Sequence, residues 1–189
     1  MIQHPIPPLY DTDSRILILG SFPSPKSREA KFFYGHPQNR FWKVMAEVLD
    51  WTAEKAGNLP DGRADPCTLT RSVSGDAAGI FIPQTIPEKS LMLHASHIAV
   101  WDTIASCDIA GASDASITNV VPNDISVILD AADIREIFCN GAKSHELYMK
   151  YIFPQNGRRA LKLPSTSPAN AACSVSKLVS SWSIIRSYL

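Results

Sequence analysis

The sequence lacks the closely spaced cysteines from which metal centres are usually built. Its cysteines stand far apart, no C-x-x-C pair occurs, and no histidine follows at ligand spacing. Zinc and iron–sulfur sites need such clusters of Cys and His ligands. We therefore expect no metal, no cofactor and reduced thiols at Cys67, Cys107, Cys139 and Cys173.

Long apolar runs are also missing. No stretch of about 18 apolar residues could cross a bilayer, and the first residues do not form the apolar core of a signal peptide. The sequence thus predicts neither membrane insertion nor secretion, and we expect a cytoplasmic protein. With 189 residues, 45% of them hydrophobic, the chain can bury one full core, so a single domain over residues 1–189 is expected.

The chain has no net charge, because 18 basic residues balance 18 acidic ones. This balance argues against a nucleic-acid partner, whose phosphates are neutralised by Lys and Arg. The distribution argues the other way, since no acidic residue follows Glu146 and only Glu29 interrupts the basic residues between positions 21 and 46. If the two segments meet, one face is basic; chance clustering is the alternative. The basic residues are Lys26, Arg28, Lys31, Arg40 and Lys43, then Lys150, Arg158, Arg159, Lys162, Lys177 and Arg186.

The apolar pattern alternates between strands and helices. Ile16 to Leu19 is uniformly apolar, as in a strand buried on both faces. Further strands are predicted at residues 97–101, 134–139 and 159–163, and helices at 39–50, 88–96, 125–129, 142–153 and 171–189. The alternation predicts an α/β fold around a mostly parallel sheet of about four strands.

Three segments show neither pattern. Residues 52–88 are interrupted by four prolines and four glycines, which indicates loops, and the pattern does not decide between substrate contacts and an insertion. Residues 111–123 are polar and turn-rich. The Pro-rich lead at residues 4–10 is expected to be extended and packed along the surface, and we assign it no chemistry.

The residues that indicate a function are most concentrated between Arg15 and Trp42. The first strand ends at Gly20, where parallel sheets place their ligand crevice. Aromatic residues then precede a loop that ends in Asn39, and aromatic faces beside a carboxamide can hold a planar base outside the duplex. Aromatic residues that merely close the core are the alternative. The segment contains Gly20, Ser21, Phe22, Pro23 and Ser24, then Phe32, Phe33, Tyr34 and His36-Pro37-Gln38-Asn39.

These motifs resemble the uracil-DNA glycosylase superfamily. The run from His36 to Trp42 is similar to its mismatch-specific branch, and the turn from Gly20 to Ser24 is closest to its hypoxanthine-DNA glycosylase branch. The resemblance continues in the same order at residues 100–102, 137–141 and 163–168. It implies a three-layer α/β/α sandwich, a monomer, and DNA with a damaged base as the partner.

The resemblance also implies roles for the first motif. The superfamily commonly places an Asp or Asn there to hold the attacking water, but this chain has Ser21-Phe22-Pro23. In the hypoxanthine branch that duty is assigned to the residue matching Asn39, which could hold water through its carbonyl oxygen. The aromatic residues expected to stack on the base are Phe22, Phe33 and Tyr34.

The second motif lacks the usual His or Asn, so the departing base would depend on hydroxyls or backbone amides. The loop could also grip phosphates, together with nearby basic side chains, and its prolines would help to pinch the strand. A helix-capping turn is the alternative for this loop. The residues concerned are Ser165, Thr166, Ser167 and Pro168, with Lys26, Arg158 and Arg159 as basic contacts.

Asp102 follows the second predicted strand, where the superfamily commonly has an Asn that reads the base edge. An ionised carboxylate accepts from the N1–H of hypoxanthine or the N3–H of uracil, and it repels the lone pair of adenine or cytosine. The structural alternative is a cap on a turn at residues 103–106.

The leading interpretation is therefore a monofunctional DNA glycosylase that acts on deaminated bases, deoxyinosine above all, and leaves an abasic site. Uracil or mismatch specificity on the same fold is the second interpretation. A non-catalytic DNA-binding member of the fold is the third.

Overall fold

The computed structural model describes residues 1–57, 79–111 and 113–189. Its centre is a parallel sheet in the order β3-β2-β6-β7. All four predicted strands are confirmed, and β2 is completely buried, as its uniform apolar sequence predicts. The strands are β2 (Ile16–Gly20), β3 (Ile98–Asp102), β6 (Glu136–Asn140) and β7 (Leu161–Leu163).

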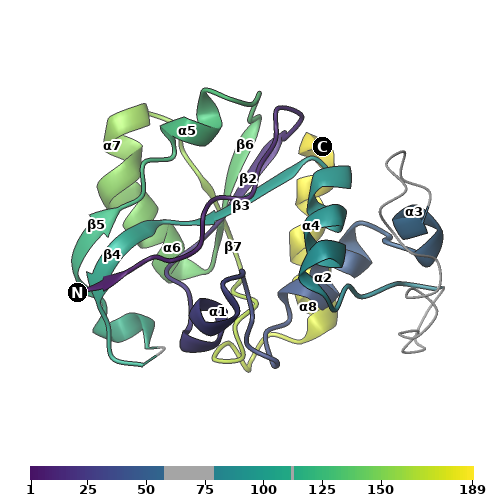
Figure 1. The fold of residues 1–189 in the computed structure, drawn as a ribbon, viewed down its shortest axis with the longest axis horizontal. Helices are drawn as coiled ribbons and strands as arrows, with labels where there is room; N and C mark the ends of the chain where they lie inside the picture. Colours follow the sequence, from purple (N-terminus) through teal and green to yellow (C-terminus); the bar gives the residue numbers. More distant parts are fainter. Residues whose placement is uncertain (58–78, 112) are drawn as a thin grey trace.

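Helices cover both faces of this sheet, so the predicted three-layer α/β/α sandwich is confirmed (Figure 1). Alternate residues of β2 point to opposite faces: Ile16 and Ile18 join one apolar cluster, and Leu17 and Leu19 join the other. One face carries α2 (Phe41–Val48), α4 (Ile86–Ala95) and α8 (Val175–Trp182). The other carries α5 (Ser126–Leu129), α6 (Ala142–Leu147), the π-helical turn η3 (Tyr148–Ile152) and α7 (Phe153–Asn156).

The helix α2 forms because its apolar residues recur on one side. Phe41, Val44, Met45 and Val48 are fully buried at the spacing of a helical stripe. The helix predicted at 171–189 begins later, at α8, where Ser174 accepts a hydrogen bond from the backbone N–H of Lys177, and it continues as the 3₁₀ segment η4 (Ser183–Tyr188). The hydroxyl-rich loop before it is therefore not the cap of this helix.

A second sheet was not predicted. It is antiparallel, in the order β1-β4-β5, and consists of β1 (Ile2–Gln3), β4 (Ile104–Asp108) and β5 (Thr118–Pro122). The turn-rich interpretation of residues 111–123 is wrong for β5, an exposed edge strand without apolar alternation that forms by pairing with β4. Since residues 104–108 are a strand, the capped turn considered for Asp102 is also excluded.

The Pro-rich lead is extended, as expected, but it is part of the core. Leu9 pairs with Val100 of β3, Ile6 is buried, and the backbone carbonyl of Ile6 accepts a hydrogen bond from Trp101 Nε1. Three short helices complete the described chain: α1 (Pro25–Ala30), α3 (Ala53–Gly57) and the 3₁₀ turn η2 (Asp114–Ser116). Of residues 52–88, the part from 58 to 78 lies outside the described residues.

Within the described part of the chain, no helix is long and apolar enough to span a membrane. Cys107, Cys139 and Cys173 are free thiols, and Cys67 lies outside the described residues. Burial raises the pKa of the Cys139 thiol to about 12.

Candidate active site

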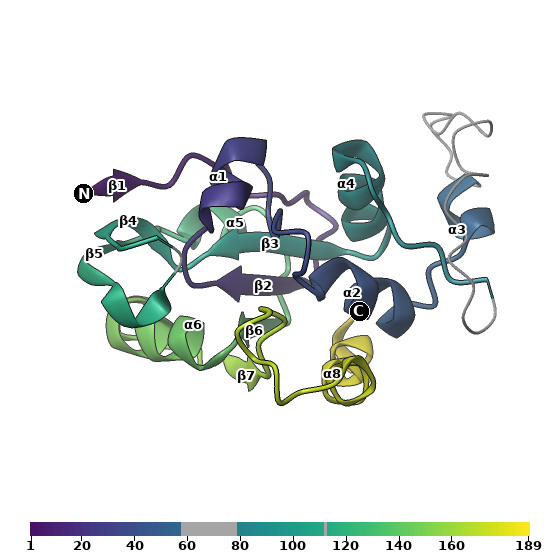
Figure 2. The same cartoon turned by 90° about the horizontal axis from the view of Figure 1, so that it is seen from below.

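A cavity of about 240 Å³ opens at the carboxyl ends of β2, β3 and β6. It is smaller than the cavities of roughly 300–1,000 Å³ that hold drug-sized ligands, and it suits a single heterocycle. In Figure 2, α1 and the loop between β7 and α8 lie on either side of β2. The lining residues from the sequence motifs are Gly20 to Ser24, Tyr34, His36, Asn39, Asp102 and Ser165 to Pro168.

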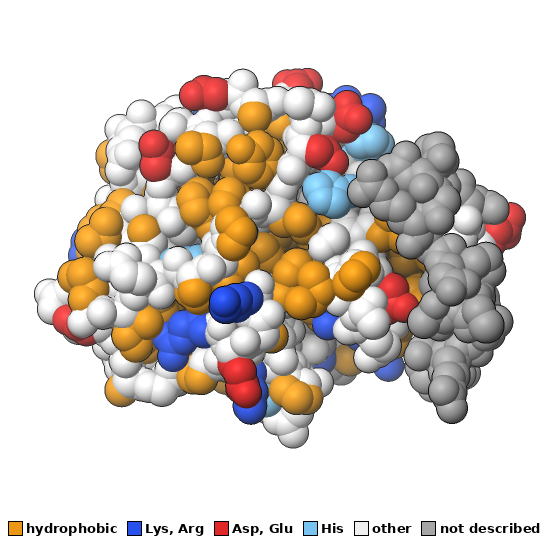
Figure 3. All heavy atoms as spheres, in the orientation of Figure 1, with side chains coloured by type: hydrophobic (Ala, Val, Ile, Leu, Met, Phe, Trp, Pro, Cys, Tyr) orange, Lys and Arg blue, Asp and Glu red, His pale blue; other side chains and the backbone are white. Residues whose placement is uncertain are grey.

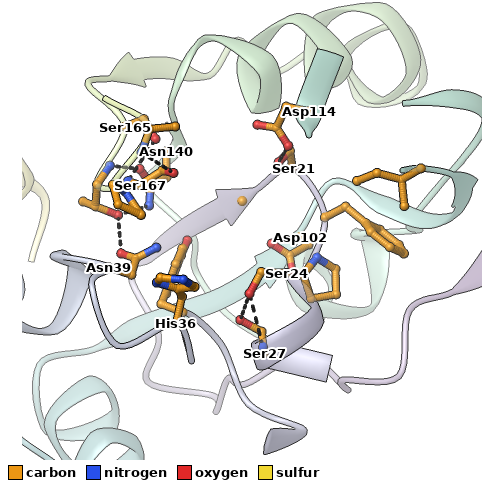
Figure 4. Close-up of a pocket in the computed structure, with 18 residues that line it drawn as sticks. Ser21, Ser24, Ser27, His36, Asn39, Asp102, Asp114, Asn140, Ser165 and Ser167 are labelled. Atoms are coloured by element: carbon orange, nitrogen blue, oxygen red, sulfur yellow. Dashed lines mark hydrogen bonds between the residues drawn. The ribbon is translucent and has the colours of Figure 1, made fainter. Parts of the chain in front are cut away.

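One side of the cavity is a chain of hydrogen bonds that ends at Asn39 (Figure 4). Thr166 Oγ1 donates to Asn39 Oδ1 over 3.0 Å and accepts from Asn140 Nδ2 over 2.9 Å. The Thr166 backbone N–H donates to Asn140 Oδ1 over 3.0 Å. Because Thr166 is fully buried, this network fixes the orientation of both asparagine side chains.

The network changes the role expected for Asn39. Its Oδ1 also accepts from the backbone N–H of Phe41, over 3.0 Å, so both lone pairs of this oxygen are occupied. In this structure the oxygen therefore has no free lone pair for the water molecule that it was expected to hold. Instead, the amide nitrogen of Asn39 faces the cavity as a donor (Figure 4).

Arg40 holds the hydroxyl-rich loop in place and is not free to bind phosphate. Its guanidinium donates to the backbone carbonyls of Thr166, Ser167, Asn170 and Cys173, with the Ser167 contact at 2.7 Å. Four carbonyls on one rigid donor group define the path of the loop. Arg40 is therefore a structural residue of the site.

Asp102 lies on the cavity floor and is only 5% exposed. Its Oδ2 lies 2.8 Å from Nε2 of His4, a residue of the Pro-rich lead. The other ring nitrogen, Nδ1, accepts from the backbone N–H of Ile6, so Nε2 carries the hydrogen that is donated to Asp102. The remaining oxygen, Oδ1, occupies the place where a Cβ on Gly20 would lie, which explains the glycine at this position.

Tyr34 lines the cavity, and its hydroxyl lies near Gly20 and Asp102 at the floor. It adopts a left-handed backbone conformation with φ of 50°, which is rare outside glycine and common at functional sites. Its ring stacks on Phe41 with centroids 3.8 Å apart. The hydroxyl is buried and makes no hydrogen bond to the described residues. Burial raises the pKa of Tyr34, and the charge of Asp102 adds to this, so the hydroxyl keeps its proton.

The two phenylalanines predicted to stack on a base differ in position. Phe22 lines the cavity, with its ring edge-on to His4 and the Arg28 guanidinium 5.7 Å from its centroid. Phe33 is 2% exposed and packs against Phe32 in the core. It has no surface on the cavity, so the prediction for Phe33 is wrong.

Two cavity residues, Asp114 and Asn140, were not among the predicted site residues. Asp114 comes from η2, and its Oδ1 accepts from the hydroxyl of Ser21 over 3.0 Å. Desolvation at the cavity wall raises the pKa of Asp114, against the lowering effect of the Ser21 hydrogen bond. Asn140 stood in the resembling motif at residues 137–141, and that position was the signal for it. No comparable signal marks Asp114 or His4.

The predicted basic contacts are only partly at the site. Arg158 and Arg159 precede β7, so they lie at its amino end, opposite the cavity. Arg158 donates to the carbonyl of Ile134, and the Arg159 guanidinium lies over the ring of Phe153. Placing these two arginines at the motif is therefore wrong. Lys26 is on α1 beside the cavity, where Figure 3 shows Lys and Arg side chains gathered, and it pairs with Glu29 over 2.9 Å.

No group of three or more His, Cys, Asp or Glu side chains among the described residues is arranged to hold a metal ion. The cavity is instead lined by side chains that could bind an organic ligand: the carboxylates of Asp102 and Asp114, the amide of Asn39, the phenol of Tyr34 and the ring of Phe22.

Comparison with known proteins agrees with this geometry. The family described as the Uracil DNA glycosylase superfamily matches residues 7–183. A hypoxanthine DNA glycosylase of Methanosarcina acetivorans is 27% identical over 171 residues, which cover 90% of this chain and 89% of that protein. A hypoxanthine DNA glycosylase of Methanosarcina barkeri is 26% identical over 147 residues, with coverages of 77% and 75%. A solution NMR structure of a Methanosarcina acetivorans protein, provisionally named a uracil DNA glycosylase, has a TM-score of 0.71 at 25% identity, over 98% of this chain and 96% of that one.

Proposed function

Because the chain belongs to the uracil DNA glycosylase superfamily, we propose that it hydrolyses the N-glycosidic bond of deaminated bases in DNA, with deoxyinosine as its main substrate. Two relatives that cover most of the chain are named hypoxanthine DNA glycosylases, which supports this choice of base. The product is an abasic site.

The observation that carries the proposal is the buried carboxylate of Asp102. His4 occupies one of its oxygens, and the other is left to a ligand in the cavity. Deamination turns the ring nitrogen of adenine or cytosine from an acceptor into an N–H donor. A fixed carboxylate accepts from that N–H and repels the parent base.

The remaining groups suit the bond cleavage. As the bond breaks, negative charge develops on the departing base and positive charge on the sugar. The Asn39 amide donates to the base, as a donor in an oxyanion hole does. Asp114 supplies the carboxylate that the first motif lacks, where it accepts a proton from the attacking water, a duty that glycosidases usually give to Asp or Glu.

Other cavity residues hold the nucleotide. Phe22 offers a ring face to the flipped base. The Ser165–Pro168 loop, fixed by Arg40, grips the phosphates through the hydroxyls of Ser165 and Ser167, whose O–H groups are free to donate. Of the described residues that line the cavity, none is a lysine, so the amine that a strand-cleaving lyase uses to form a Schiff base is missing there. This supports a monofunctional glycosylase, which breaks the base–sugar bond and leaves the strand intact.

Single-turnover excision from duplex oligonucleotides tests the function. Duplexes that contain deoxyinosine, deoxyuridine or a G·T mismatch are incubated with excess protein, and abasic sites are revealed by alkaline cleavage. We expect deoxyinosine to be excised fastest. Faster excision of uracil or mismatched thymine would assign the substrate to another branch, and DNA binding without excision from any duplex would support the non-catalytic interpretation.

A further inference from the structure

Two polar groups at the floor of the cavity have no complete set of partners in the described structure. One is the Tyr34 hydroxyl, which is buried and unbonded. The other is Asp102 Oδ1, since His4 binds only Oδ2. A buried polar group without a partner is costly, and a ligand that supplies the partner removes that cost.

The two groups are neighbours. Both approach the point where a Cβ on Gly20 would lie: Asp102 Oδ1 occupies it, and the Tyr34 oxygen is 3.5 Å from it. Asn140 approaches the Tyr34 hydroxyl, and its amide nitrogen keeps a second N–H besides the one bonded to Thr166, which can donate to the Tyr34 oxygen and leaves the Tyr34 O–H free to donate. The floor therefore presents one donor and one acceptor side by side.

We propose that Tyr34 and Asp102 together read the lactam edge of a base, and that His4 keeps Asp102 as the acceptor half of this pair. The inference rests on the proposed function and names its specificity determinants. In a lactam a carbonyl oxygen is adjacent to a ring N–H, so Tyr34 donates to the carbonyl and Asp102 accepts from the N–H.

This pairing separates deaminated bases from their parents. Hypoxanthine and uracil present a carbonyl and an N–H, whereas adenine and cytosine present an amino group and a lone pair, which is the reverse pattern. A site with fixed polar groups rejects the reversed pattern strongly, because its own groups are then left unpaired. Guanine and thymine share the lactam, and their stable pairing in the duplex excludes them, since extrusion is easiest for a mispaired base.

Several contacts preorganise the pair. The Tyr34 ring is held by its stack on Phe41, and the raised pKa of its hydroxyl keeps it a donor. His4 lies edge-on to Phe22 and Trp101 and is 3% exposed, so its N–H is fixed toward Asp102. Without that donor Asp102 loses the contact that fixes it as an acceptor, so the discrimination between hypoxanthine and adenine should fall.

The donor half is tested with Tyr34→Phe and two oligonucleotides that carry non-hydrolysable 2′-fluoro analogues. One analogue has hypoxanthine, and the other has unsubstituted purine, which lacks the carbonyl. We expect binding of the hypoxanthine analogue to weaken about tenfold, the effect of one lost hydrogen bond, and binding of the purine analogue to stay the same. An equal loss for both analogues, or no loss for either, overturns the role of Tyr34.

The acceptor half is tested with His4→Phe, which keeps a ring between Phe22 and Trp101. The preference of the variant for the hypoxanthine analogue over the adenine analogue should shrink by about tenfold. His4→Gln keeps an N–H donor and should retain most of the preference. The matched control is His94→Phe, which removes a histidine–aspartate pair, His94 with Asp11, outside the cavity.

An unchanged preference in His4→Phe, with only a lower melting temperature, would mean that His4 is purely structural. Failure of the proposed function is recognised separately. If the wild-type protein excises no deoxyinosine, the proposed function is wrong. If it does excise deoxyinosine and the variants affect all analogues equally, only the proposal that Tyr34 and Asp102 read the lactam edge is wrong.

Discussion

The two polar atoms of the Asn39 side chain have different roles: the oxygen stabilises the fold, and the nitrogen faces the cavity. The oxygen caps the start of α2 and binds Thr166. Asn39→Ala removes both functions, so it cannot by itself separate catalysis from folding. Asn39→Asp can keep both accepted hydrogen bonds while replacing the cavity donor by a negative oxygen.

We expect both Asn39 variants to lower single-turnover excision of deoxyinosine by about two orders of magnitude or more, with DNA binding retained. The reason is that the donor acts on charge present only in the transition state. Recovery of activity in Asn39→Asp would show that the side chain serves the water and not the departing base. Excision within about tenfold of wild type in Asn39→Ala would remove it from catalysis.

Asp114 gives the reaction a pH dependence. Its pKa lies above the ordinary aspartate value, so the group takes up a proton at a higher pH than an exposed aspartate does. Since the ionised form accepts the proton from water, excision should fall as the pH drops through this raised pKa. The acid limb of kcat/KM should therefore lie above the ordinary aspartate range.

Asp114→Asn should lower the plateau rate and remove that acid limb. Ser21→Ala removes a hydrogen bond that lowers the pKa, so it should move the limb to higher pH without abolishing activity. A pH profile unchanged in Asp114→Asn would assign the limb to another group.

At the scale of elements, the loop between β7 and α8 depends on a residue from a distant helix end. Arg40 stands just before α2, and its guanidinium binds four carbonyls of this loop and of the segment that follows it. The loop in turn positions Thr166, and Thr166 positions Asn39. Catalytic geometry and loop conformation are therefore coupled through one side chain.

Arg40→Gln should lower the unfolding free energy by about 2 kcal/mol or more, because hydrogen bonds from a charged group are lost. For a chain of this length that corresponds to a fall of roughly 4–8 °C in the melting temperature. Excision should fall as well. Arg159→Gln, at an exposed position opposite the cavity, is the matched control and should change neither quantity; a stable, active Arg40→Gln would contradict the coupling.

At the scale of the whole molecule, a neutral chain has its cations distributed unevenly. Lys26 and Lys31 are exposed beside the cavity on α1 and at its end, whereas Arg158 and Arg159 lie at the other end of the sheet. A DNA strand that enters the cavity passes the first pair and not the second.

DNA binding should therefore weaken with salt in spite of the zero net charge. Replacing Lys26 and Lys31 by alanine should reduce the slope of log affinity against log salt by up to about two, since each phosphate contact contributes about 0.9. The double variant Arg158→Gln/Arg159→Gln should keep the wild-type slope. The opposite result would place the DNA on the other end of the molecule.

The local sequence pattern determined much of the fold of this protein and the place of its cavity. The uniform apolar run of β2 and the alternation of strands and helices predicted the parallel sheet, and the family match confirmed the resemblance that the motifs carried. These features could be predicted because burial on both faces and helical periodicity depend on residues close together in the chain. The place of the cavity followed, since parallel strands end at one edge of the sheet.

The tertiary structure alone decided how the site is completed. Asn39 meets Thr166 across 127 positions, His4 meets Asp102 across 98, and Ser21 meets Asp114 across 93. Phe33 and Tyr34 are adjacent and chemically similar, yet one is core and the other faces the cavity, because Tyr34 adopts a left-handed backbone conformation. Contacts between segments so far apart arise from packing of the whole chain and leave no period in the sequence, so they could be found only in three dimensions.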